Sequence, residues 1–127
     1  DDNYLNLWSK RMQNPLDDLE TLILDSNNYV LSLGEKPKQY SDIMSQYTGL
    51  FKIKKDIWND LKKIYLDQKN PYLHMTSLFN IAIKHGIKIK AIRIHKDWME
   101  FDTPNDLLID DYLPETFFDS KSISNAR

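Results

Sequence analysis

The chain has 127 residues, the length of one domain, and its hydrophobic content of 41% is ordinary for a globular protein. Its formal net charge of -2 leaves no excess of Lys and Arg to neutralise phosphates, which argues against duplex nucleic acid as a main partner. It contains no cysteine, which excludes disulfides and Cys-based zinc sites, and no apolar run approaches the roughly 20 residues that a membrane-spanning helix needs.

The first elements along the chain are predicted to be a short helix or loop followed by a β-hairpin. Residues 4–12 carry apolar anchors, and we interpret Trp8 among them as a core side chain. Residues 21–24 and 29–33 are β-branched or apolar runs, and residues 25–28 between them (Asp-Ser-Asn-Asn) carry turn chemistry. The glycine that follows the second run is expected to end its strand.

The middle of the chain is predicted to hold a strand and two amphipathic helices. Residues 47–53 favour a strand, and a glycine inside a strand, here Gly49, often marks a point where something approaches the backbone closely. Residues 54–68 place apolar side chains at helical spacing, with Trp58 on the face expected to enter the core. A second helix is expected to begin near Thr76 and to end at the next glycine.

The last third of the chain is predicted to add two strands and a helix. Residues 87–95 alternate apolar and polar side chains, which predicts a strand with one buried face, and residues 98–101 predict a short strand. Thr103 followed by Pro104 predicts the start of a third helix. The polar residues 114–127 are expected to form a flexible tail. This order of elements is typical of a mixed α/β chain.

The strongest candidate site is the segment Trp-Met-Glu-Phe-Asp-Thr-Pro-Asn-Asp-Leu at residues 98–107. If this segment begins as a strand, Glu100 and Asp102 point to the same side. Two acids at a strand end suit a hard cation such as Mg²⁺, which can bridge triphosphate oxygens during nucleotidyl transfer. The alternative is that Asp102 only caps the following helix and that Glu100 is solvated.

Other residues suit contacts with phosphate or substrate, and each also has a structural explanation. Lys36, just past a strand end, can reach a phosphate as a point charge, or it belongs to an ordinary exposed turn. Thr76 lies near an anion at a helix N-terminus, or it is the N-cap. An acidic cluster either binds a cation or is a solvated loop, and its members are Asp17, Asp18 and Glu20.

Together these segments resemble nucleotidyltransferases of the GT-A-like fold. Residues 98–107 resemble the closing motif of that superfamily, of the form W-x-E-[IVF]-D-[TS]-x-x-D-L. Four further segments fall in the expected order and resemble the phosphocholine cytidylyltransferase-like branch, which includes sugar-phosphate nucleotidyltransferases: residues 14–20, 33–37, 46–50 and 75–78. The resemblance implies an α/β fold with a mixed sheet flanked by helices, the C-terminal portion of a Rossmann-like GT-A fold. Residues 1–113 would be its acceptor-binding part.

The resemblance also implies roles for individual residues. Asp102, with Glu100, would bind Mg²⁺ as the C-terminal set of metal ligands. Lys36 would be the catalytic cation that faces the acceptor phosphate, with Glu35 beside it. Gly49 would let the acceptor lie close to its strand. The residues implied on the acceptor side are Tyr47, Gly49, Thr76, Asp17, Asp18 and Glu20.

The implied reaction is attack of an acceptor phosphate oxygen on the α-phosphorus of an NTP, CTP being favoured, with release of pyrophosphate. Phosphocholine, a phosphonate such as aminoethylphosphonate, and a sugar 1-phosphate all remain open as the acceptor. The chain departs from the family because it lacks the glycine-rich loop, of the form L-A-A-G-x-G-x-R, and the first metal-binding Asp. We therefore expect this chain alone to be inactive and to be part of a longer protein.

The alternative is a non-catalytic binding or dimerisation domain derived from the same fold. In either case we expect the exposed sheet edge to be covered by a missing N-terminal half or by a second copy in a homodimer. Neither nucleic acid nor a membrane is an expected partner. The absence of cysteine fits a reducing cytoplasm as the location.

Overall fold

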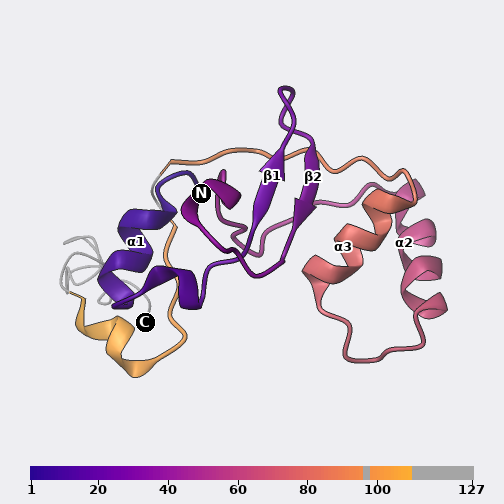
Figure 1. The fold of residues 1–127 in the computed structure, drawn as a ribbon. Helices are drawn as coiled ribbons and strands as arrows, with labels where there is room; N and C mark the ends of the chain where they lie inside the picture. The colour runs from indigo at the N-terminus through magenta and orange to yellow at the C-terminus, as the bar shows by residue number, and fades with distance from the viewer. Residues whose placement is uncertain (96–97, 110–127) are drawn as a thin grey trace, which may run out of the picture.

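Figure 1 shows the computed structural model of the chain, with a central β-hairpin and helices on either side of it. The structure describes residues 1–95 and 98–109. The elements are α1 (Tyr4–Arg11), η1 (Pro15–Asp17), β1 (Leu22–Leu24), β2 (Val30–Leu33), η2 (Tyr40–Asp42), α2 (Lys55–Asp67), α3 (Met75–Lys84) and η3 (Pro104–Leu108), where η marks a 3-10 helix. The predicted tail at residues 114–127, and with it the end of the predicted 1–113 unit, lies outside the described residues.

The predicted hairpin is confirmed. β1 and β2 pair antiparallel, with Leu22 opposite Leu33. The turn between them is closed by Asp25, whose carboxylate accepts hydrogen bonds of 2.8 Å from the backbone N–H groups of Asn27 and Tyr29. Both ends of each strand are buried, so the hairpin presents an apolar face to the core.

One single bridge widens the hairpin at each edge. Ile43 pairs parallel with Leu22, and Lys90 pairs antiparallel with Tyr29. Within the described residues the sheet is therefore two antiparallel strands with one bridge on either side. The described part of the chain is a small α/β arrangement with three α-helices, and it contains less of a mixed sheet than we predicted.

Three predicted strands do not form. Residues 47–53 join no ladder in the described chain, and Gly49 there adopts a φ of +76°, which turns the backbone away from an extended path. Residues 87–95 pair with the hairpin only through the single bridge, although Ile89 and Ala91 pack against its buried side chains, and Ile92 beyond the bridge is 88% exposed. Residues 98–101 lie beside α1 without pairing to a described strand. An alternating pattern predicts burial of one face, but it does not supply the partner strand that a ladder requires.

The two amphipathic helices are confirmed as α2 and α3, and the N-terminal stretch forms α1. α3 begins after His74, so Thr76 lies inside the helix and is buried there rather than serving as its N-cap. Trp58 was expected in the core, but it is 55% exposed. The buried stripe of α2 instead passes through Leu61 and Ile64.

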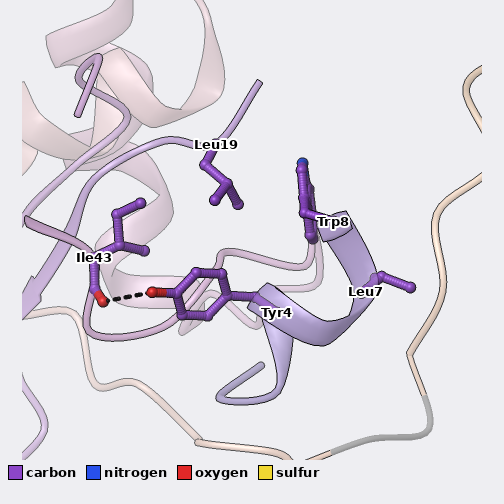
Figure 2. Close-up of a cluster of buried hydrophobic side chains, with 5 residues drawn as sticks. All are labelled: Tyr4, Leu7, Trp8, Leu19 and Ile43. Carbon is purple, nitrogen blue, oxygen red and sulfur yellow. Dashed lines mark hydrogen bonds between the residues drawn. The ribbon is translucent and has the colours of Figure 1, made fainter. Parts of the chain in front are cut away.

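Buried apolar side chains group into three clusters along the molecule. The first joins α1 to the segments around η1 and η2, and its members are Tyr4, Leu7, Trp8, Leu19 and Ile43 (Figure 2). The second packs the hairpin against Phe79 of α3, and the third packs α2 against α3. Trp8 is 2% exposed, as its core interpretation predicts. None of the helices in the described part of the chain combines the length and apolar composition that crossing a bilayer demands.

Candidate active site

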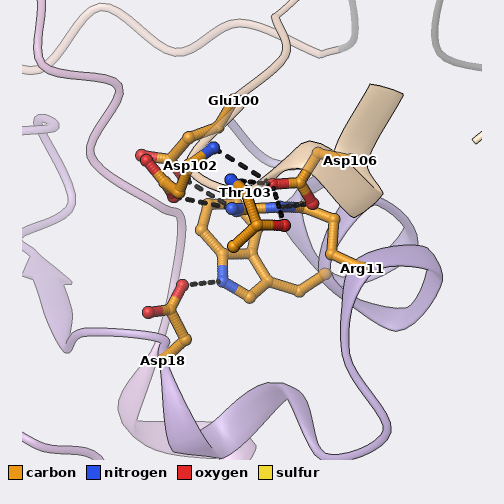
Figure 3. Close-up of polar contacts among 7 residues, drawn as sticks. Arg11, Asp18, Glu100, Asp102, Thr103 and Asp106 are labelled. Carbon is orange, nitrogen blue, oxygen red and sulfur yellow. Dashed lines mark hydrogen bonds and ion pairs between the residues drawn. The ribbon is translucent and has the colours of Figure 1, made fainter. Parts of the chain in front are cut away.

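Arg11 ties the last turn of α1 to the acidic segment that follows Trp98. Its Nη1 donates to Glu100 Oε2 at 2.9 Å, and its Nη2 donates to Asp102 Oδ2 at 2.6 Å. Its Nε donates to Asp106 Oδ1 at 3.1 Å. The Arg11 side chain is only 1% exposed, so a single buried guanidinium faces three carboxylates (Figure 3).

Asp106 holds this acidic segment in shape by capping η3. Its Oδ2 accepts hydrogen bonds from the backbone N–H groups of Asp102 and Thr103, at 3.0 and 2.8 Å, and from the Thr103 hydroxyl. The predicted third helix does begin after Thr103, but it is the 3-10 turn η3. The cap is thus supplied by Thr103 and Asp106, which removes the alternative that Asp102 is present only as a cap. Hydrogen bonds from Arg11 and from this backbone lower the pKa of Asp106 to about 2.

Asp18 completes an acidic triad with Glu100 and Asp102. The carboxylate oxygens that the three can offer lie within 4.8 Å of one another. Trp8 Nε1 donates to Asp18 Oδ2 at 2.8 Å, just as Arg11 holds one oxygen of each of the other two acids. Among the described residues, no protein donor holds the second oxygen of any of these carboxylates. Carboxylate oxygens grouped in this way are the kind of ligand that a hard divalent cation prefers.

The triad carries more negative charge than Arg11 balances. Burial raises the pKa of Glu100 above its ordinary value, and the neighbouring Asp102 raises it further, against the lowering effect of Arg11. A divalent cation among these carboxylates would favour their ionised forms. The electrostatics of the triad therefore suit a cation as well as its geometry does.

The triad lies on the wall of a cavity of about 370 Å³. The cavity is lined by Trp8, Asp18, Glu20, Gln46, Tyr47, Thr48, Gly49, His74, Met75, Thr76, Glu100 and Asp102. It therefore brings together most of the residues predicted from the sequence, namely Asp18, Tyr47, Gly49, Thr76, Glu100 and Asp102. They come from four segments that are far apart along the chain, which is the arrangement expected of a built binding site.

The remaining predicted residues do not line this cavity. Lys36 is exposed, and its Nζ donates to the backbone carbonyl of Asp17. Asp17 turns its carboxylate to the Asn14 amide at 2.8 Å. The backbone N–H of Glu35 donates to the Thr21 hydroxyl at 3.1 Å. Because Asp17 adjoins the lining residue Asp18, this group of side chains stands next to the cavity rather than inside it.

Thr76 has a packing role beside its place in the cavity. A Cβ built on Gly34 would lie 2.4 Å from the Cβ of Thr76, closer than atoms of the two side chains can approach. Gly34 also adopts a φ of +78°, a conformation that favours glycine. The N-terminus of α3 can therefore rest against the end of β2 only because residue 34 has no side chain.

The sequence did not reveal several residues of the site. Arg11 went unnoticed, and Trp8 was interpreted only as a core anchor. Their i, i+3 spacing puts them on one face of a helix, which is the only signal that the sequence offers. Glu20, whose pKa is raised by burial, was expected near the acceptor side with Asp17 and Asp18, and it lines the cavity. Gln46 and His74 enter the lining because two loops converge on the cavity, and no local pattern marks that convergence.

Comparison with known proteins links the chain to nucleotidyl transfer. It is 36% identical over 116 residues to a CTP:phosphoglutamine cytidylyltransferase of Campylobacter jejuni, and the alignment covers 84% of this chain. The same alignment covers 46% of that protein, so the chain spans about half the length of the curated relative. No protein-family profile matches the chain, and no solved structure matches it. The similarity supports a relationship to the cytidylyltransferases.

Proposed function

We propose that this chain is the acceptor-binding part of a nucleotidyltransferase that joins a nucleotide, CTP being favoured, to a phosphorylated small molecule and releases pyrophosphate. The relationship to a cytidylyltransferase supports the reaction class. The observation that carries the proposal is the triad of Asp18, Glu100 and Asp102 on the wall of a cavity of about 370 Å³. A cavity of this size suits a small phosphorylated acceptor.

We propose Mg²⁺ as the cation of the triad. Its donor set consists of carboxylate oxygens, the ligands that hard cations prefer, and each acid offers one oxygen that no described protein donor holds. Asp102 and Glu100 would hold the ion, as the family resemblance implies, and Asp18 would join them. When bound, Mg²⁺ would neutralise charge that develops on the phosphates.

The chain's own residues would position the acceptor. Tyr47, Gly49 and Thr76 line the cavity and would contact it, and Gly49 leaves open space because a Cβ there meets no atom within 4 Å. Lys36 and Glu35, beside the cavity, would face the acceptor phosphate. Since a phosphate is already an anion, little acid–base chemistry is required, and orientation and charge neutralisation would supply most of the rate.

The acceptor classes that we propose are phosphocholine, a phosphonate, a sugar 1-phosphate and, following the relative's name, phosphoglutamine. Because the chain spans about half of that relative, we propose that the nucleotide is gripped by another part of the full-length protein and that this chain alone is inactive.

A non-catalytic binding or dimerisation domain is the second candidate, and one observation favours it. The α2–α3 end exposes large apolar side chains, including Trp58 at 55%, Leu66 at 60% and Tyr72 at 87%. Exposed apolar side chains of this kind can form the contact surface for a protein partner. Under this reading the triad would be a structural acid cluster and would contribute nothing to turnover.

The test is pyrophosphate release by the full-length protein with CTP, Mg²⁺ and each acceptor in turn. We expect Asp102→Asn to lower kcat by about 100-fold or more, in the range seen when an electrostatic transition-state contact is lost. The matched control is Asp56→Asn on α2, an exposed acid outside the cavity lining, which should retain wild-type turnover. Near-normal turnover of Asp102→Asn would refute the metal assignment, and absence of pyrophosphate release from the wild type with every acceptor would favour the non-catalytic candidate.

A further inference from the structure

We propose that Trp8 and Arg11, one turn apart on α1, are the positioning residues of the cation site. The inference rests on the proposed function, because it concerns the same three carboxylates. Each acid has one oxygen held by these two side chains, and the other oxygen is thereby left for the ion. α1 would then be the element that shapes the site, although it supplies none of the metal ligands.

The hydrogen bonds divide the work between the two side chains. Trp8 Nε1 holds Asp18 at 2.8 Å, and the two terminal nitrogens of Arg11 hold Glu100 and Asp102 at 2.9 and 2.6 Å. Asp18 lies more than 80 residues before the other two ligands, yet all three carboxylates are hydrogen-bonded to the same face of α1. The i, i+3 spacing on α1 therefore fixes the separation between Asp18 and the other two acids.

Both positioning side chains are themselves held rigidly. Trp8 is 2% exposed and stacks on Trp98, with ring centroids 5.8 Å apart and planes 20° apart. The Arg11 guanidinium lies 5.2 Å from the centre of the Trp8 ring, and its Nε is fixed by Asp106. Side chains packed in this way keep their rotamers, so the carboxylates that they hold are already in position before the ion binds.

The geometry also explains why an arginine and an indole fit here. A planar guanidinium can donate to two carboxylates and to Asp106 at fixed directions, which a lysine ammonium cannot reproduce. The indole N–H adds one donor without adding positive charge, so the triad keeps the net negative charge that a divalent cation needs. Groups that hydrogen-bond to metal ligands in this manner change metal affinity by about 10–100-fold when they are removed.

The chain offers a matched pair of substitutions that separates positioning from packing. Trp8→Phe and Trp98→Phe each remove one indole from the same stacked pair, but only Trp8 donates to a triad carboxylate among the described contacts. Arg11→Lys is a second variant, which keeps the charge and removes the two-pronged donor. The full-length protein and each variant are titrated with Mn²⁺, followed by the electron paramagnetic resonance signal of the free ion, and their Tm values are measured in parallel.

We expect Trp8→Phe and Arg11→Lys to weaken Mn²⁺ binding by about 10–100-fold, while Trp98→Phe binds like the wild type at a similar Tm. If the wild type binds Mn²⁺ and Trp8→Phe and Trp98→Phe bind it equally well, the positioning role is wrong and the proposed function stands. Wild-type affinity in Arg11→Lys would overturn the role of Arg11. If the wild type does not bind Mn²⁺ while pyrophosphate is released, the cation site itself is overturned, and this inference falls with it.

Discussion

The two ends of the molecule are held together in different ways. At the α2–α3 end, apolar side chains from two helices that are neighbours in sequence pack together, with Leu61 and Ile64 against Leu78 and Ala82. At the α1–η3 end, the guanidinium of Arg11 joins residues 89 to 95 positions away. Apolar packing depends on volume and shape, whereas buried ion pairs depend on charge and on the protonation of their acids. The end that carries the candidate site is therefore the end whose geometry responds to charge.

The largest loss of stability should come from truncating an apolar side chain in the core. Phe79 is 5% exposed, and its ring makes edge contacts with Tyr47 and Phe51, with centroids 6.2 and 5.4 Å away. We expect Phe79→Ala to lower the free energy of unfolding by about 3–5 kcal/mol in urea titrations of the full-length protein. The control is Leu31→Ala on β2, where the side chain is 54% exposed and the loss should be small. Equal losses in the two variants would show that Phe79 does not hold the hairpin to α3.

A smaller loss of stability, which depends on pH, should follow from Asp106→Asn at the α1–η3 end. The substitution removes the charge that pairs with Arg11. It also leaves one side-chain oxygen to accept both from Arg11 and from the backbone N–H groups of Asp102 and Thr103. We expect the free energy of unfolding at pH 7 to fall by about 1–3 kcal/mol, the cost of leaving a buried donor unsatisfied. Equilibrium unfolding in urea measures this loss.

The pH dependence follows from the sign of the pKa shift. The folded pKa of Asp106 is about 2, below the ordinary value of 3.8, chiefly because of the hydrogen bond from Arg11. A carboxyl group with a depressed folded pKa stabilises the protein above its unfolded pKa, and this stability is lost as the pH falls through the folded pKa. The difference in unfolding free energy between the wild type and Asp106→Asn should therefore shrink between pH 3.8 and about 2. A constant difference across that window would mean that the Arg11–Asp106 pair contributes no charge-dependent stability. The difference in unfolding free energy between the wild type and Phe79→Ala should not shrink over the same pH range, because no charge is removed at the apolar end.

The same contrast explains how much of the fold could be predicted. Helix α2 follows from periodic apolar spacing, and the hairpin follows from the turn chemistry around Asp25, because both signals are local. The predicted strand at residues 47–53 failed for a reason that was also visible, since its glycine allows a φ of +76° that ends an extended path. Trp58 was misplaced because a periodic stripe does not show how much of a helix face its neighbours cover.

The sequence predicted the pairing of site residues only within one short motif. Glu100 and Asp102 share a short segment, so their pairing could be expected from spacing. Asp18 was assigned to the acceptor side, and the structure brings its carboxylate within 4.8 Å of theirs. Apart from its i, i+3 spacing to Trp8, Arg11 gave no signal, because a basic residue in the last turn of a helix is common and its three acidic partners lie about 90 positions away. Ion pairs across that distance are set by the fold and not by local sequence.

The smallest effect on stability should come from Lys36, which makes it the cleanest probe of the acceptor side. Its side chain is exposed, so we expect Lys36→Ala to change the free energy of unfolding by less than about 0.5 kcal/mol. Loss of a charged hydrogen bond to the acceptor phosphate, worth roughly 1.5 kcal/mol, should lower kcat/KM for the acceptor by about tenfold. Lys38→Ala is the control, because it removes an equal charge from the same exposed loop. An equal loss in both variants would indicate a general field effect of the loop. An unchanged kcat/KM in Lys36→Ala would leave Lys36 as a turn residue whose Nζ donates to the Asp17 carbonyl, and the acceptor phosphate would then have to be met by the cavity wall itself.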